Sequence, residues 1–209
     1  MTIAFAATED VITPGQCLAL KPAARALYMR CGRVVIAQDG TETILTEDRC
    51  ALIVGAATLT GDGVVWGCEA TRDLAAPDPL RTVLHVRLPR DPGAPMLLRA
   101  DRVDFPPGAV TPRHGHAGPG IRRLLAGRLF AEIGETHRRI DAGEAWFESG
   151  LEPVVGHNIA PASAFVRCMV LDPDLLGRPT FRAASPEDAA KPRAVGYRQF
   201  FDTIVTLPH

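Results

Sequence analysis

The sequence predicts an all-β fold, and three observations support this prediction. The apolar segments are short and rich in β-branched residues, which is typical of strands. The chain of 209 residues holds 19 glycines and 18 prolines, scattered between these segments and not gathered in one linker. Few stretches keep the apolar spacing of a helix. A chain of this length can bury a core as one large domain or as two small ones.

The predicted strands follow one another along most of the chain. Polar, glycine-containing turns separate them, for example at residues 38–42, 61–63 and 141–144. Only the stretch SPEDAAKP (185–192) favours a helix, and it favours one capped turn at most. The segments predicted as strands are RVVIA (33–37), ALIVG (51–55), GVVWG (63–67), TVLHVRL (82–88), RLFAEI (128–133), AWFE (145–148) and AFVRCMVL (164–171).

Residues 32–55 and 127–150 share a pattern that indicates an internal repeat. Both blocks begin with Gly-Arg, end with Gly and place strand, polar turn, strand, polar turn and strand in the same order. A Pro-Gly pair precedes each block, at 14–15 and 107–108. Because the identity between the blocks is low, coincidence remains an alternative. A true repeat predicts two similar β units, each closing its own sandwich or barrel so that few strand edges stay exposed.

Charge and cysteine content narrow the possible partners and location. The net charge is −1, with acidic and basic residues interspersed, which favours neither nucleic acid nor an anionic membrane as partner. The first residues lack the basic and apolar regions of a signal peptide, and no window approaches the apolar run of about 18 residues that spans a bilayer. The five cysteines form no CxxC pair, which favours reduced thiols and a cytoplasmic location.

The stretch GAVTPRHGHAGPGIRRLLAG (108–127) resembles the first sequence motif of the cupin superfamily. That motif is Gly, five residues, His-x-His, three or four residues, Glu, six residues and Gly. His114 and His116 stand at the two histidine positions, and glycines stand at both ends. Gly120 takes the place of the glutamate.

The stretch GEAWFESGLEPVVGHN (143–158) resembles the second cupin motif, which is Gly, five residues, Pro-x-Gly, two residues, His, three residues and Asn. Its first glycine and its final asparagine fit. Ser149 and Leu151 replace the Pro-x-Gly, and Val154 stands where the motif has its histidine.

The resemblance implies a bicupin, with two cupin-type jelly-roll β-barrels in one chain. We expect a degenerate N-terminal cupin-like barrel over residues 1–95 and a C-terminal barrel with the His-x-His site over residues 96–175. Residues 176–209 are then a C-terminal extension with a final strand. Residues 1–84 contain no histidine, so a structural role is expected for the first barrel. Because cupins commonly pair, the resemblance also implies a homodimer.

The His-x-His pair indicates a metal site, because residues i and i+2 of a strand point to the same face. The imidazoles of His114 and His116 would then converge, and imidazole nitrogen suits a divalent transition metal such as Zn, Fe, Ni or Mn. A catalytic site needs about three protein ligands and an open position. The resemblance implies two further ligands, but neither motif position holds one here. Glu148 and His157 are the candidates to replace them, and His157 would need a bulge at Gly156 to face inward.

Two further residues are candidates for contact with a small-molecule ligand. Strand alternation sends either Arg122 or Arg123 inward, and an inward arginine can bind a carboxylate or phosphate with two hydrogen bonds. A solvated strand edge is the alternative. Trp146 and Phe147 alternate in the same way, so one of the two lines the cavity. We take Arg122 and Trp146 as the candidate ligand-binding residues.

Two classes of function remain open on the sequence alone. The first is a metal-binding cupin, which could be an enzyme of dioxygenase, isomerase or lyase type that acts on a small polar metabolite such as an organic acid. The second is a non-catalytic metabolite-binding or sensory cupin with a degenerate metal site. A cavity lined mainly by apolar groups and one arginine would favour the second class.

Overall fold

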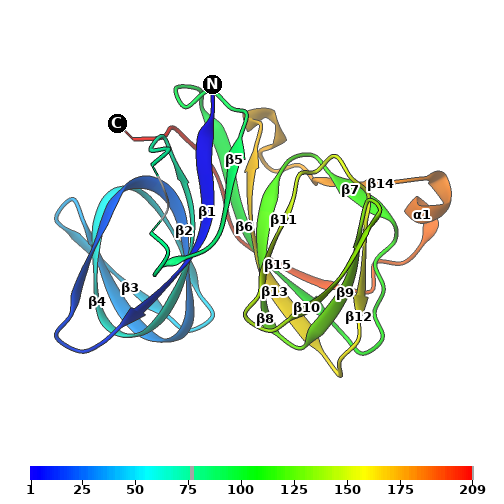
Figure 1. The fold of residues 1–209 in the computed structure, drawn as a ribbon, viewed down its shortest axis with the longest axis horizontal. Coiled ribbons are helices and arrows are strands. Elements are labelled where there is room, and N and C mark those ends of the chain that lie inside the picture. Colours follow the sequence, from blue (N-terminus) through cyan, green and yellow to red (C-terminus); the bar gives the residue numbers. More distant parts are fainter. Residues whose placement is uncertain (76–77, 209) are drawn as a thin grey trace. The chain divides into compact units, whose positions relative to one another are not determined.

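The computed structural model describes residues 1–75 and 78–208, and antiparallel strands make up most of it (Figure 1). The all-β prediction is therefore confirmed. Contacts divide the chain into two compact units, Met1–Met96 together with Val205–His209, and Leu97–Ile204. Among the described residues, no helix is long and apolar enough to cross a membrane.

The first unit is one five-stranded sheet in the order β3-β2-β4-β1-β5. Strands β2 and β4 are each 22 residues long, and both are strongly bent. Ala24 of β2 pairs with Val54 and also with Ala70, so two parts of β4 flank the same stretch of β2 and the sheet curls on itself. The strands are β1 (Ile3–Ile12), β2 (Cys17–Gln38), β3 (Thr41–Thr46), β4 (Cys50–Thr71) and β5 (Thr82–Leu88).

The turn predicted at residues 61–63 is wrong, because β4 continues through it. Gly61 and Gly63 have φ angles of +134° and +148°, which favour glycine. A Cβ atom at Gly61 would collide with the backbone of Arg33, and one at Gly63 would collide with that of Cys31. These glycines therefore allow β2 and β4 to approach closely and do not reverse the chain.

The second unit holds two five-stranded sheets, in the orders β10-β9-β12-β7-β14 and β11-β8-β13-β6-β15. The order strand, turn, strand, turn, strand that was predicted for 32–55 and 127–150 is present in both blocks. The strands of the two sheets are β6 (Met96–Phe105), β7 (His114–His116), β8 (Gly120–Ala126), β9 (Arg128–Ile133), β10 (Thr136–Asp141), β11 (Ala145–Glu148), β12 (Val154–Asn158), β13 (Ser163–Leu171), β14 (Phe181–Ala183) and β15 (Gly196–Val205).

The apolar core of the second unit is built from both of its sheets. The inward side chains of alternating strand residues pack together there, as expected for a two-layer β structure. The buried members of this core are Val103, Phe105, Ala109, Leu124, Leu129, Ala131, Ile140, Trp146 and Phe165.

The chain after β13 stays with the second unit as far as Ile204. A 3-10 turn, η1 (Pro173–Leu175), precedes β14, which pairs with β7, and β15 lies beside β6. Between β14 and β15, the one-turn helix α1 (Pro186–Ala190) is capped by the hydroxyl of Ser185, which accepts a 3.0 Å hydrogen bond from the Asp188 amide. The single capped turn predicted at 185–192 is confirmed.

Candidate functional site

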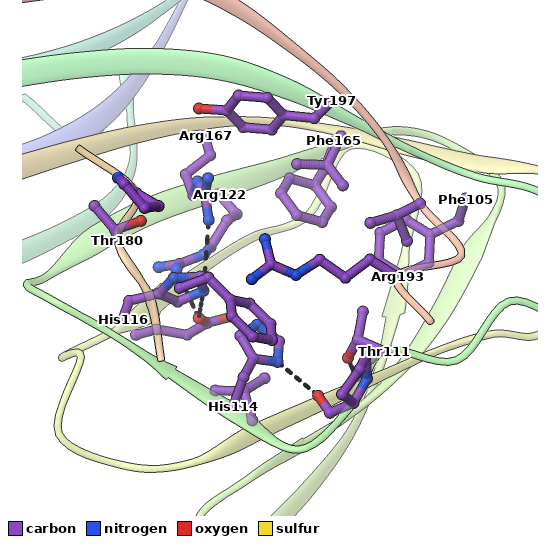
Figure 2. Close-up of a pocket in the computed structure, with 18 of the residues that line it drawn as sticks. Phe105, Thr111, His114, His116, Arg122, Phe165, Arg167, Thr180, Arg193 and Tyr197 are labelled. Carbon is purple, nitrogen blue, oxygen red and sulfur yellow. Dashed lines mark hydrogen bonds and ion pairs between the residues drawn. The ribbon is translucent and has the colours of Figure 1, made fainter. Parts of the chain in front are cut away.

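The second unit encloses a cavity of about 420 Å³ that is lined by residues of both sheets and of the segment after β13. Aromatic rings form much of its wall, including Phe105 and Phe165 (Figure 2) and also Trp146. Polar side chains gather at one side of it. This cavity contains most of the residues that the sequence singled out.

Strand β7 directs two imidazoles into the cavity. His114 and His116 are both buried, and their ring centroids lie 4.9 Å apart with the ring planes at 89°. The Nδ1–H of His114 donates a 2.8 Å hydrogen bond to the carbonyl oxygen of Pro112, so its Nε2 carries the lone pair. The ring of His114 also stacks on Phe181 at a centroid distance of 4.6 Å.

The second imidazole has a different environment. His116 Nε2 lies 3.4 Å from Nη1 of Arg167, and because a guanidinium only donates, Nε2 is the acceptor. A neutral His116 ring therefore carries its proton on Nδ1. That Nδ1 is buried and has no hydrogen-bond partner among the described residues. The cavity thus contains a buried donor that lacks an acceptor.

Glu148 reaches the cavity from the neighbouring strand. Cross-strand pairing of β11 with β8 places Glu148 directly opposite Gly120, the position where the cupin motif has its glutamate. Glu148 Oε1 accepts a 2.9 Å hydrogen bond from Nε1 of Trp146. Its Oε2 lies 2.6 Å from Nη2 of Arg122 and 3.7 Å from Nε2 of His116. A carboxylate from β11 therefore lies beside the histidines.

The guanidinium of Arg122 holds this carboxylate. Arg122 points into the cavity and is 1% exposed, whereas Arg123 lies outside the lining and donates a 3.0 Å hydrogen bond to the carbonyl oxygen of Gly143. Nη1 of Arg122 donates a 2.7 Å hydrogen bond to the carbonyl oxygen of Gly120. A Cβ atom on Gly120 would lie 3.2 Å from the same Nη1 and 2.9 Å from the carbonyl oxygen of Cys168. The absence of a side chain at position 120 therefore makes room for Arg122.

A second buried arginine, which the sequence reasoning did not identify, lies beside His116. Arg167 of β13 pairs directly across the sheet with Asp101 of β6, and its Nε and Nη2 donate hydrogen bonds of 3.0 and 2.9 Å to that carboxylate. The hydroxyl of Tyr197 donates a further 3.1 Å bond to Asp101. The signal in the sequence was a single arginine within the apolar run AFVRCMVL (164–171).

Both histidines are neutral near pH 7. Burial lowers the pKa of His116 strongly, and the positive charges of Arg122 and Arg167 lower it further. Burial also lowers the pKa of His114, and it outweighs the opposing hydrogen bond to Pro112.

The two arginines remain cations in the same environment. Burial lowers the pKa of Arg122 to about 10, and the charge of Glu148 opposes that effect. Burial also disfavours the charged form of Arg167, but the charge and hydrogen bonds of Asp101 outweigh burial and raise its pKa. The cavity therefore presents fixed positive charge at neutral pH.

The structure does not bring His157 to the site, which corrects the expectation that it acts as a ligand. Strand β12 pairs with β9 from Val154 to Asn158 without a register shift, so no bulge corrects the phase. Val154 and Gly156 line the cavity, whereas His157 lies outside the lining. Its Nε2 is 2.7 Å from Oε1 of Glu132, and its side chain is 31% exposed.

The residues present do not fit a resident divalent metal ion. Two imidazoles and a carboxylate are suitable donors in principle. Glu148 Oε2, however, is held by Arg122, and the lone pair of His116 Nε2 accepts from Arg167. A metal ion would also lie beside two buried guanidinium cations and would be repelled by them. Within the part of the chain that the structure describes, no group of three or more His, Cys, Asp or Glu residues is arranged to hold a metal ion.

The segment after β13 completes the wall, and sequence reasoning missed its contribution as well. Thr180, Arg193 and Tyr197 line the cavity (Figure 2), and so does Phe181. The guanidinium carbon of Arg193 lies 3.7 Å from the centroid of the Phe181 ring, on which His114 also stacks. The sequence predicted a capped turn and a final strand in this segment, but it gave no reason to place these side chains in a cavity.

Several solved structures resemble this chain, although no family model matches the sequence and no curated protein matches it at a significant level. AerE from Microcystis aeruginosa has a TM-score of 0.60 and 15% identity, over 80% of this chain and 88% of that one. A mutant of salicylate 1,2-dioxygenase from Pseudoaminobacter salicylatoxidans, in complex with gentisate, has a TM-score of 0.58 and 10% identity. The match covers 94% of this chain and 73% of that one. A cupin 2 conserved barrel protein from Leptotrichia buccalis has a TM-score of 0.51 and 10% identity. The match covers 81% of this chain and 89% of that one.

These likenesses confirm the cupin fold that the two motifs indicated, with its all-β jelly-roll architecture. At 10–15% identity they indicate the fold alone. The further prediction that the chain contains two cupin barrels stays a prediction.

Proposed function

We propose that the second unit binds a small organic anion in its cavity, and that buried arginines hold this anion without a resident metal ion. The observation that carries the proposal is the pair Arg122 and Arg167, whose side chains are 1% and 8% exposed and which both line the cavity. The unpartnered Nδ1 donor of His116 lies in the same lining. Donors of this kind require an acceptor, and an anion supplies one.

The charge of the lining supports the same conclusion. Three carboxylates pair with arginines of the lining: Glu148 with Arg122, Asp101 with Arg167 and Asp202 with Arg99. Positive charge remains in excess, and in a partly buried site it attracts an anion more strongly than it would at the surface. The arginines of the lining are Arg99, Arg122, Arg167, Arg178 and Arg193.

The apolar walls favour a ligand with an apolar or aromatic body. Phe105, Trp146 and Phe165 line the cavity, and the Trp146 indole meets the Phe165 ring edge to face at 5.2 Å between centroids. Small-molecule sites typically combine such walls with a few polar groups that fix orientation. The structure of the dioxygenase that resembles this chain holds gentisate, an aromatic carboxylate, which makes aromatic carboxylates reasonable first probes.

Calorimetric titration with benzoate and with its uncharged analogue benzamide tests this proposal. We expect benzoate to bind and benzamide to bind much more weakly, since only the carboxylate satisfies the arginines. Arg122→Met should lose benzoate binding. Arg123→Met is the matched control, because Arg123 is the adjacent arginine outside the lining. Equal binding of benzoate and benzamide would contradict the proposal.

A metal-dependent cupin enzyme of dioxygenase, isomerase or lyase type is the second candidate function. Its supporting observation is that His114, His116 and Glu148 meet at one side of the cavity, with 3.7 Å between His116 Nε2 and Glu148 Oε2. Metal binding would require Arg122 to leave Glu148. Elemental analysis of the purified protein distinguishes the candidates. A stoichiometric metal that disappears in His114→Ala would favour the enzyme.

A further inference from the structure

We infer that Arg193 is a second anion-binding residue at the cavity, so that the ligand is a dianion with its second acidic group within reach of Arg193. This inference rests on the proposed binding of an organic anion by Arg122 and Arg167. Beyond that proposal, the ligand carries two negative charges, and Arg193 recognises the second of them.

The position of Arg193 allows it to meet a ligand. Arg193 lies between α1 and β15, on a chain segment whose residues are mostly exposed. In Figure 2 its side chain extends into the cavity from the side opposite Arg122 and His116. Its guanidinium carbon is 3.7 Å from the Phe181 centroid, so the flat cation rests on an aromatic face.

Arg193 differs from the two buried arginines in its charge partners. Arg122 has Glu148 and Arg167 has Asp101. No carboxylate among the described residues lies within ion-pair distance of the Arg193 guanidinium. A ring face is a weaker partner than a carboxylate that accepts two hydrogen bonds, so an anionic group on the ligand can take its place.

Aromatic side chains line the cavity beside the Arg193 side chain and favour a ligand with an apolar part. Phe105 and Phe165 line the cavity in the region that Arg193 crosses, and their centroids are 5.8 Å apart (Figure 2). A ligand with one acidic group satisfies the buried arginines and leaves Arg193 on Phe181. A ligand with a second acidic group within reach of Arg193 gains a further charge-assisted contact.

Calorimetric titration with the three benzenedicarboxylates tests the inference, with benzoate as the single-charge reference. Phthalate, isophthalate and terephthalate carry two carboxylates on one ring at increasing separation, so the set covers the unknown spacing of the two cationic groups. We expect at least one of them to bind about tenfold or more tightly than benzoate.

Two variants separate recognition by Arg193 from a merely structural role. Arg193→Gln should lower the affinity for the dicarboxylate much more than the affinity for benzoate, so that the preference disappears, and Arg193→Lys should restore part of the preference because it keeps the charge. Arg198→Gln is the matched control, because Arg198 also stacks on an aromatic ring, at 5.0 Å from the Phe200 centroid, but lies outside the cavity lining.

Each outcome decides the matter. If benzoate binds and no dicarboxylate binds more tightly, the second anion site is refuted while the proposed anion binding stands. The same holds if Arg193→Gln weakens benzoate and dicarboxylate equally, or if Arg198→Gln removes the preference as well. If neither benzoate nor any dicarboxylate binds, the proposed function fails and this inference fails with it.

Discussion

Arg122 folds back over Gly120, two residues earlier on the same strand, and donates a 2.7 Å hydrogen bond from Nη1 to its carbonyl oxygen. The same guanidinium places Nη2 2.6 Å from Oε2 of Glu148. A positive charge of the chain itself therefore lies among the histidines and the carboxylate, where a cupin metal site would hold its ion. The missing side chain at position 120 is part of this arrangement, because a Cβ atom there would crowd Nη1.

We predict that Gly120→Ala destabilises the protein, although alanine is a small residue. The added methyl would lie 2.9 Å from the Cys168 carbonyl oxygen and 3.0 Å from Cγ of Met169, so the core must shift, at a cost of about 1–3 kcal/mol. Urea unfolding measures the free energy of unfolding. Gly115→Ala is the control, because its Cβ would meet only ordinary contacts, the nearest at 3.7 Å from the Gly150 carbonyl oxygen. Equal stability of both variants would contradict the crowding.

Arg122→Met should convert the site into one that a divalent metal stabilises. Removal of the guanidinium leaves Glu148 buried without its cation, which we expect to cost about 3–5 kcal/mol of stability. Added Co²⁺ should then raise the unfolding temperature of the variant and leave that of the wild type unchanged. The double variant Arg122→Met/Glu148→Gln should lose this response. A wild type that responds to Co²⁺ as strongly as the variant would show that Arg122 does not exclude metal.

Stability should fall in mild acid because two histidines are buried in neutral form. Burial and neighbouring arginines hold the pKa of His116 below its ordinary value, and burial does the same for His114. Below about pH 6.5 the unfolded chain therefore binds protons that the folded protein does not. Each histidine then lowers the free energy of unfolding by up to ~1.4 kcal/mol per pH unit as the pH falls, and at higher pH this loss is absent.

Urea unfolding from about pH 7 down to about pH 5 measures this slope. His116→Gln should make the dependence shallower, since the titrating group is gone. His137→Gln is the control, because it replaces an exposed histidine in the same way. A slope that is the same in all three proteins would show that His116 takes up its proton in the folded state.

His157→Ala should leave ligand binding intact. The imidazole of His157 contacts Glu132 and lies outside the cavity lining, so its loss removes a partly exposed hydrogen bond, worth about 1 kcal/mol of stability. Titration with benzoate and urea unfolding measure the two quantities. A large loss of binding would mean that β12 turns its other face toward the cavity.

The fold was predictable because its signals are local. Three signals can be recognised in the sequence without knowledge of distant contacts. They are the short apolar runs, the glycine-rich turns and the spacing of the motifs at 108–127 and 143–158. The turn at 61–63 was misjudged because glycine marks both chain reversal and close approach of two strands. Only the pairing with β2 distinguishes the two, and that pairing is not local.

The candidate site was predictable only where alternation along a single strand determines which side chains face the cavity. Alternation along β7 brought His114 and His116 together, and it excludes His157 because no bulge interrupts β12. The meeting of Glu148 with Arg122 depends on the register between β11 and β8, which the sequence does not specify. Arg193 enters from a segment far along the chain, so no spacing rule could place it.

Titration of benzoate into protein that has been treated with a chelator and dialysed tests the central claim most directly. If buried arginines hold the anion, benzoate binds with the same affinity before and after chelation, and Arg122→Met removes the binding in both preparations. If chelation abolishes binding and added Zn²⁺, Fe²⁺, Ni²⁺ or Mn²⁺ restores it, a metal ion holds the ligand and anion binding by the arginines alone is contradicted.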